Sequence, residues 1–175
     1  MKTLKKIIVI AAAAIFAVMY GCGKIEHRGS MVVKMTDAPA LYQEVNIEIK
    51  SVEAHYSDIN RNDGWIELKT KSGVYNLLEL RGGVTAVIAD DERMPLGTVT
   101  QMRLVLGANN SVKANGISYS LIIPSGTETG IKLNVDKTIK AGQKYEILMD
   151  FDAEKSIIVT GNGMYQLSPV ISVVK

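Results

Sequence analysis

Along most of the chain after Met31, apolar and polar residues alternate, which is the period of a β-strand whose two faces meet different surroundings. In residues 44–56 the apolar side chains occupy odd positions as far as Ile49 and even positions from Val52 onward. One extra residue in a strand restores its inward face after such a slip. The pattern therefore predicts one long strand with a β-bulge near Lys50–Ser51.

Further alternating segments, and the turns between them, predict more strands. Residues 98–107 and 145–151 have the same period of two. Asn115–Gly116 joins two short apolar segments, and this dipeptide is typical of a type I′ hairpin turn. Residues 83–92 differ, because their apolar side chains lie at helical spacing. We expect one or two helical turns there, ending before the next proline.

These elements indicate the fold class. Many short strand-like segments separated by turns, with little helical periodicity, are typical of antiparallel sandwiches and barrels. We therefore expect an all-β protein, an antiparallel Greek-key β-sandwich with one short helical segment.

The first part of the chain has a different character. Lys2, Lys5 and Lys6 precede an uncharged run over residues 7–19, and the single cysteine, Cys22, follows. A basic end before a short apolar stretch is the layout of a secretory signal, and the run is shorter than the roughly 20 residues that cross a bilayer. The segment resembles a lipoprotein-class signal peptide, which predicts a lipid on Cys22. An ordinary signal peptide or an uncleaved anchor is the alternative.

The expected organisation follows from this signal. Residues 1–21 would be removed, residues 22–30 would form a flexible tether, and residues 31–175 would form a single β-sandwich domain. Removal takes three of the 20 basic residues and leaves 17 against 18 acidic ones. A nearly neutral domain has no field that attracts nucleic acid. The expected partner is a membrane, reached through the N-terminal lipid. The expected location is the envelope of a Gram-negative-type bacterium, at its outer membrane.

Several short sequences, taken in their order, resemble one known family. They look like the bacterial envelope lipoproteins described as domain of unknown function 4382, and the resemblance would cover residues 31–173. It implies a prealbumin-like or immunoglobulin-like β-sandwich on a lipidated tether, with no established activity. The segments that carry the resemblance are Met35–Pro39, Val52–His55, Tyr75–Leu78, Gln101–Leu104, Leu106–Gly107 and Leu148–Ala153.

A polar cluster in residues 58–64 is the first candidate site. A hard cation such as calcium prefers several oxygen ligands from one turn. The cluster departs from an EF-hand loop, because its glycine comes one place late and Lys69 stands where a glutamate is required. The alternative is a polar β-turn. The candidate calcium ligands are Asp58, Asn60, Asn62 and Asp63.

Aromatic side chains form the second candidate site. Tyr56 and Trp65 flank the polar turn, and Tyr75 follows ten residues later. Flat aromatic faces of this kind could bind a sugar ring. The alternative is that Trp65 fills the core of the sandwich, as large aromatics commonly do.

Three carboxylates are the third candidate. Asp150 and Asp152 are two residues apart, so on a strand they share one face and could bind a cation or act as an acid and a base. The alternative is a structural role, in which they accept hydrogen bonds from the loop at Lys155–Ser156. Asp37 could likewise cap the turn that follows it.

No catalytic set is apparent, so we do not expect an enzyme. His27 lies in the tether, and His55 stands apart from other catalytic residue types. No cofactor is expected, apart from the calcium considered above. The favoured function is a non-catalytic binding or adhesion module for a glycan, a peptide or another envelope protein. The alternatives are a pilus-like structural subunit that exchanges residues 31–37 or 166–175 as a strand and, last, an envelope hydrolase.

Overall fold

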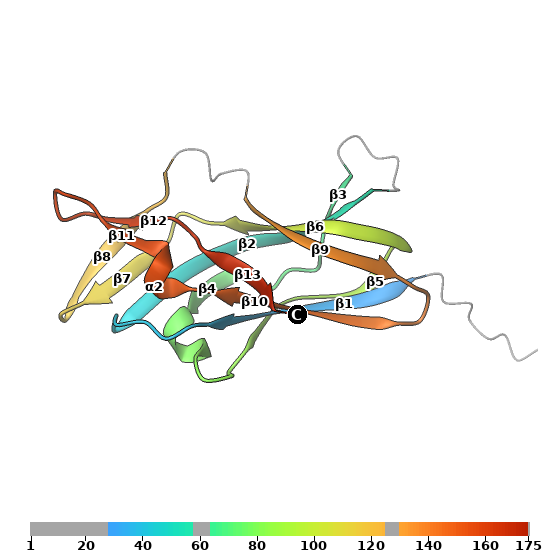
Figure 1. Cartoon of the computed structure of the whole chain (residues 1–175), viewed down its shortest axis with the longest axis horizontal. Coiled ribbons are helices and arrows are strands. Elements are labelled where there is room, and N and C mark those ends of the chain that lie inside the picture. Colours follow the sequence, from blue (N-terminus) through green and yellow to red (C-terminus); the bar gives the residue numbers. More distant parts are fainter. Residues whose placement is uncertain (1–27, 58–63, 125–129, 175) are drawn as a thin grey trace, which may run out of the picture.

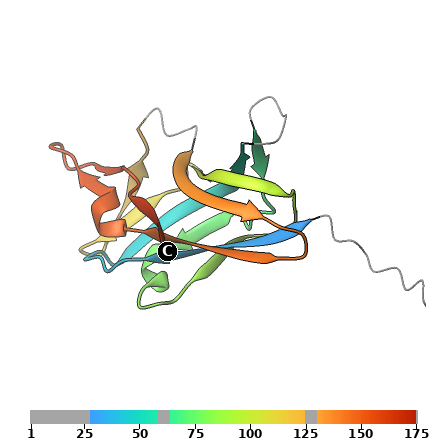
Figure 2. The same ribbon diagram turned by 45° about the vertical axis from the view of Figure 1, so that its right-hand side comes forward.

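The computed structural model describes residues 28–57, 64–124 and 130–174, which form two β-sheets packed against each other (Figures 1 and 2). The smaller sheet has the strand order β13-β10-β1-β5, and the larger has the order β11-β12-β8-β7-β2-β6-β9, with β3 and β4 also paired to β2. The strands of the smaller sheet are β1 (Gly29–Asp37), β5 (Ala86–Met94), β10 (Lys144–Phe151) and β13 (Ile171–Val174). Those of the larger sheet are β2 (Glu44–Tyr56), β3 (Trp65–Glu67), β4 (Gly73–Asn76), β6 (Gly97–Leu106), β7 (Ser111–Ala114), β8 (Ile117–Ile122), β9 (Ile131–Ile139), β11 (Ile157–Val159) and β12 (Tyr165–Leu167).

The all-β sandwich is confirmed, but its sheets are mixed and not purely antiparallel. β1 runs parallel to β10, and β12 runs parallel to β8, while the other pairs are antiparallel. In the described part of the chain the helices are two single turns, η1 (Leu77–Leu80) and α2 (Ala153–Ser156). Both parallel pairs join segments far apart in sequence, so the local alternation that predicts each strand carries no signal of its direction.

Two local predictions are confirmed in the larger sheet. The pairing of β2 with β6 shifts register between Ile49 and Ser51, which is the predicted bulge. β7 and β8 form an antiparallel hairpin, and both turn residues, Asn115 and Gly116, have positive φ, as a type I′ turn requires. The bulge is why β2 keeps its apolar side chains buried along both halves.

The core lies between the two sheets and is built from their inward-facing apolar positions. β1 contributes Met31, Val33 and Met35, each fully buried, and the alternate residues of β2, β6 and β10 face them. Aliphatic and methionine side chains make up most of this core, while Tyr56 and Phe151 are its buried aromatic residues. Burial of this apolar surface is the main force that holds the sheets together.

The predicted helical turns at residues 83–92 are wrong. Ala86–Met94 forms β5, an edge strand that pairs with β1. The register shifts between Val33 and Lys34, and this bulge leaves the consecutive residues Ile88 and Ala89 both buried. Two adjacent buried residues break the period of two, which explains why the segment does not read as a strand.

The strand proposed for exchange at residues 31–37 occupies a central position. β1 pairs with β10 on one side and with β5 on the other, so releasing it would break two ladders of hydrogen bonds. β1 also begins at Gly29, two residues before the expected domain boundary, and that glycine is buried. In residues 166–174, β13 is an edge strand that pairs with β10 alone.

Candidate functional site

The three aromatic residues predicted to bind a ligand do not come together. Tyr75 pairs with Ile47 on β2, whereas Trp65 pairs with His55 on the same strand. Eight residues of extended strand separate those two partners, which is roughly 26 Å. Tyr56 is 1 % exposed and belongs to the core. Tyr56 is therefore a core residue, which corrects its assignment to a ligand site.

Trp65 lies on the outer face of the larger sheet and is only partly buried. The guanidinium carbon of Arg103 lies 4.4 Å from the centre of its ring, and the ammonium of Lys132 lies at 5.7 Å. His55 meets the ring edge-on, with a centroid distance of 5.1 Å. Arg103 also forms an ion pair with Glu53 across the strands. Trp65 thus does not plug the core, and a cation already lies over its ring where a sugar would stack.

The calcium loop and the lipidation site fall outside the described residues. Asp58, Asn60, Asn62 and Asp63 lie in the undescribed segment 58–63, and Cys22 lies in the segment 1–27. Within residues 28–57, 64–124 and 130–174, no three His, Cys, Asp or Glu side chains are grouped so that they could hold a metal ion. Both assignments therefore stay predictions.

Asp37 and Asp152 hold the turn where β10 passes into α2. Asp152 is the N-cap of α2, with its carboxylate accepting the Lys155 N–H at 3.0 Å. The Lys155 hydrogen bonds hold the pKa of Asp152 below its ordinary value. Asp37 does not cap the turn after itself, because its Oδ1 accepts the N–H of Ala153 at 2.9 Å. The structural role expected for Asp152 is confirmed, whereas Asp37 bonds to α2 and not to the turn that was expected.

The surroundings of the Asp37 carboxyl disfavour its charged form. It is 5 % exposed, and its Oδ2, like Oδ1 of Asp150, is buried and has no hydrogen-bond partner in the described residues. Burial raises the pKa of Asp37 to about 6, the charges of Asp150 and Asp152 act in the same direction, and the Ala153 N–H opposes them. A proton therefore binds more readily to Asp37 in the folded protein than in the unfolded chain.

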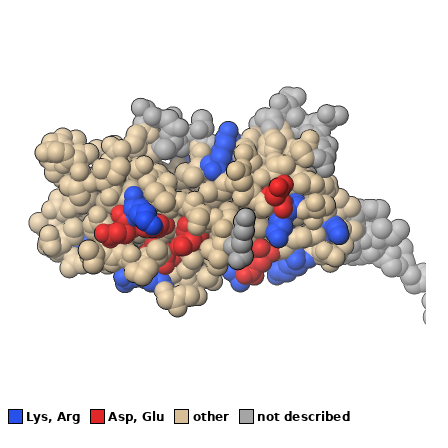
Figure 3. All heavy atoms as spheres, in the orientation of Figure 1, with Lys and Arg blue, Asp and Glu red and all other residues tan. Residues whose placement is uncertain are grey.

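At one end of the molecule, three strands expose aliphatic side chains and contain no charged residue. β8, β11 and β12 lie together there, and residues 117–124 and 156–174 contain no Asp, Glu, Lys or Arg. In Figure 3 the outermost part of this end shows neither basic nor acidic atoms, and charged atoms of both signs lie just inside it. We call this region the β8–β11–β12 end. Its exposed aliphatic side chains are Ile117, Ile122, Ile158, Val159 and Met164.

The exposed side chains of this end lie on both faces of its small sheet. Ile122 and Ile158 stand on either side of Gln166 across three paired strands, on the outer face. Val159 pairs with Tyr165 on the other face, where Tyr165 stacks on Tyr119 at 4.7 Å. Exposed aliphatic side chains that gather at one end of a domain are typical of surfaces that associate with another molecule.

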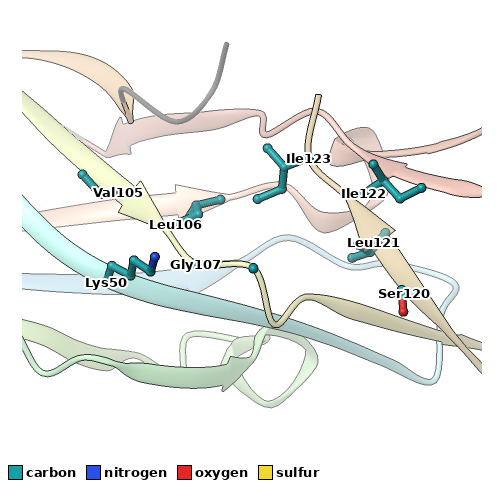
Figure 4. A pocket seen from close by; sticks show the side chains of 9 residues that line it. Lys50, Val105, Leu106, Gly107, Ser120, Leu121, Ile122 and Ile123 are labelled. Atoms are coloured by element: carbon teal, nitrogen blue, oxygen red, sulfur yellow. The ribbon is translucent and has the colours of Figure 1, made fainter. Parts of the chain in front are cut away.

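A groove of about 620 Å³ opens beside this end, between the end of β6 and β8. Figure 4 shows Lys50 at one end of the groove and Ile122 and Ile123 at the other, with the backbone of Gly107 between them. Its volume lies in the usual range for small-molecule sites. The residues that line it are Lys50, Val105, Leu106, Gly107, Ala108, Ser120, Leu121, Ile122 and Ile123.

Sequence patterns missed both the groove and the uncharged end. The 19 residues from Ser156 to Val174 contain no charged side chain, and that run could have identified the end. The groove has no comparable signal, because it depends on where two strand pairs diverge.

Comparisons with known proteins bear on the family to which the chain belongs. No helix among the described residues is long and apolar enough to span a lipid bilayer. Neither a curated protein nor a solved structure matches the chain significantly. Residues 28–169 match the model of the family described as domain of unknown function DUF4382. Because this match covers most of the sequence, the chain belongs to the DUF4382 family.

Proposed function

We propose that this protein is a non-catalytic binding module anchored to the bacterial outer membrane by a lipid on Cys22, and that its β8–β11–β12 end binds another envelope protein. The observation that carries the proposal is the combination of exposed aliphatic side chains and missing charges at that end. Depletion of charged residues at the centre of the contact is the compositional mark of a protein–protein interface.

The positions of Cys22 and β1 support an orientation in which the β8–β11–β12 end points away from the membrane. β1 begins at Gly29, at the end of the molecule opposite to β8, β11 and β12 (Figures 1 and 2). Only six positions separate Cys22 from Arg28, the first described residue. A lipid on Cys22 would therefore hold the β1 end near the bilayer and leave the β8–β11–β12 end directed away from it.

A protein partner fits this surface better than a glycan does. Sugar binding relies on a free aromatic face and on side chains that exchange hydrogen bonds with hydroxyl groups. Trp65, the natural candidate, is covered by Arg103 and lies on β3, outside the β8–β11–β12 end. Aliphatic side chains such as Ile158 and Val159 offer apolar contact area and no hydrogen bonds to a sugar.

Site-specific photocross-linking tests the proposal. A benzophenone amino acid replaces Ile158 in the full-length protein in its native host, and we expect a discrete cross-linked partner after irradiation. The matched control replaces Leu96, which is similarly exposed (43 % against 45 %) but lies in the β5–β6 turn near the start of β1. No cross-linked species is expected from position 96. Equal cross-linking from both positions, or a partner from position 96 alone, would contradict the proposal.

A further inference from the structure

β11 is an edge strand whose free side is open. It pairs with β12 alone, at one end of the larger sheet. The Ser156 carbonyl and the Thr160 N–H are bonded across to the chain on either side of β12, at 2.8 Å each. Successive residues of a strand direct their backbone groups to opposite sides. The N–H and C=O groups of Ile157 and Val159 therefore point away from β12, and no strand within the described residues pairs with them.

The two longest edge strands are protected against pairing with another chain. β5 is covered by residues 69–71, and the Lys71 N–H donates to the Ile88 carbonyl at 2.8 Å. β9 carries three exposed charged side chains, and its pairing with β6 is interrupted by a bulge. Covering segments, charges and bulges are common ways to block an open edge. β11 is short, but it has none of these three protections, since residues 156–174 contain no charged side chain.

Exposed aliphatic side chains stand on both faces of the sheet at this edge. Ile158 is 45 % exposed on the outer face, and Val159 is 57 % exposed on the inner face. A protein that rests on one face of the sheet reaches only one of these two side chains. A strand that pairs with the edge reaches both, because its own side chains alternate between the two faces.

We propose that the partner adds a strand to the free edge of β11, through an extended, uncharged segment with apolar side chains. This inference rests on the proposed function and specifies how the partner binds. The backbone of the added segment would exchange hydrogen bonds with Ile157 and Val159, while its side chains would pack beside Ile158 and Val159. A charged segment fits less well, because β11 offers no side chain with which it could form an ion pair.

A second copy of the chain fits this edge less well than a different protein does. The β11–β12 hairpin projects along the molecule, away from the start of β1 (Figures 1 and 2). Two copies that pair antiparallel through β11 would therefore point in opposite directions. Their Cys22 residues would lie at opposite ends of the dimer, so a single leaflet could not anchor both. The added strand is accordingly assigned to another envelope protein.

Photocross-linking in a proline variant tests the strand addition. The benzophenone residue stays at position 158 of the full-length protein in its native host, and Val159 is replaced by proline. Val159→Pro removes an N–H that points to the free edge and leaves the ladder with β12 intact. We expect the yield of cross-linked partner to fall about tenfold, with a melting temperature near that of the wild type. Val159→Ile keeps both the N–H and an apolar side chain, so its yield should be unchanged.

The matched control is Val74→Pro on the edge strand β4. Val74 is similarly exposed (54 % against 57 %) and pairs with Glu48 of β2. The Glu48 backbone is bonded to Gly107 and Asn110 on the other side of β2, so the Val74 N–H also points to a free edge. Val74→Pro should leave cross-linking from position 158 unchanged.

A second cross-linking position keeps the test decisive if Val159→Pro does not fold. The benzophenone residue is placed at position 159 instead of 158, with no proline present, and the cross-linked peptides are located by mass spectrometry. Because the two positions face opposite sides of the sheet, an added strand should be captured from both. The two sites of capture should lie within about five residues of each other in the partner.

Other outcomes would overturn the inference. A partner captured from position 158 alone, or captured undiminished in a folded Val159→Pro protein, would bind the outer face of the sheet and leave the proposed function standing. Failure to capture a partner from either position would contradict the proposed function as well. A cross-linked species with twice the mass of the chain would assign the edge to a second copy.

Discussion

Replacement of Tyr56 by alanine is expected to lower the free energy of unfolding by about 3–5 kcal/mol, the cost of deleting a large buried aromatic side chain. Tyr56 is 1 % exposed, and its hydroxyl donates to the Pro95 carbonyl at 3.0 Å. The substitution removes the packing of the ring and leaves a cavity between the sheets. It also leaves the Pro95 carbonyl without its donor. Urea unfolding, followed through the fluorescence of the single tryptophan, measures the change.

Two variants separate packing from the hydrogen bond. Tyr56→Phe keeps the ring and is expected to cost about 1 kcal/mol, because it loses one hydrogen bond. Tyr75→Ala serves as the control, since Tyr75 is only partly buried and its hydroxyl donates to the Lys71 carbonyl at the surface. Its cost should be well below that of Tyr56→Ala. A Tyr56→Ala variant of wild-type stability would show that Tyr56 is not a core residue.

Replacement of Asp37 by asparagine is expected to stabilise the protein by about 3 kcal/mol at pH 8 and to leave it nearly unchanged at pH 4. Burial raises the pKa of Asp37 from 3.8 to about 6, so the folded state binds this proton more tightly than the unfolded state. The contribution of Asp37 to stability is therefore greatest below pH 4, falls as the pH rises to 6, and includes the full cost of the buried charge above that. Asparagine is neutral throughout and still accepts the Ala153 N–H through its amide oxygen.

Urea unfolding at several pH values between 4 and 8 measures the effect. The difference between Asp37→Asn and the wild type should grow between pH 4 and pH 6 and then remain constant. Asp136→Asn is the matched control, because Asp136 is exposed on β9 and its φ of 58° is one that asparagine adopts readily. That control should show little change at any pH. A destabilising Asp37→Asn at pH 8 would mean that the ionised carboxylate is needed for the fold.

The strands were predictable wherever one face of the sheet is buried and the pattern is uninterrupted. β2, β6 and β10 follow their alternation, and even the bulge at Lys50–Ser51 is visible as a change of phase. β5 was not predictable, because its own bulge buries Ile88 and Ala89 side by side. The parallel pairing of β1 with β10 joins residues more than a hundred positions apart, and no local periodicity encodes such a contact.

The candidate sites were less predictable than the fold, since they depend on distances between strands. Tyr56 and Trp65 are close in sequence, yet one faces the core and the other faces solvent. The sequence contains the bulge that exposes Lys50, but the groove beside it forms only when the end of β6 and the end of β8 come together in the folded sheet. Membership of the DUF4382 family confirms the resemblance seen in the ordered short segments, and it leaves the ligand to be found by experiment.

Intact-mass analysis of the protein purified from the membranes of its native host tests the central claim most directly. The orientation proposed here depends on a lipid at Cys22, seven residues before the start of β1 at Gly29. We predict a chain that begins at Cys22 and carries the added mass of its acyl groups, since more than one chain is needed for stable anchoring. A mass equal to that of residues 1–175 with an unmodified Cys22 would contradict the account.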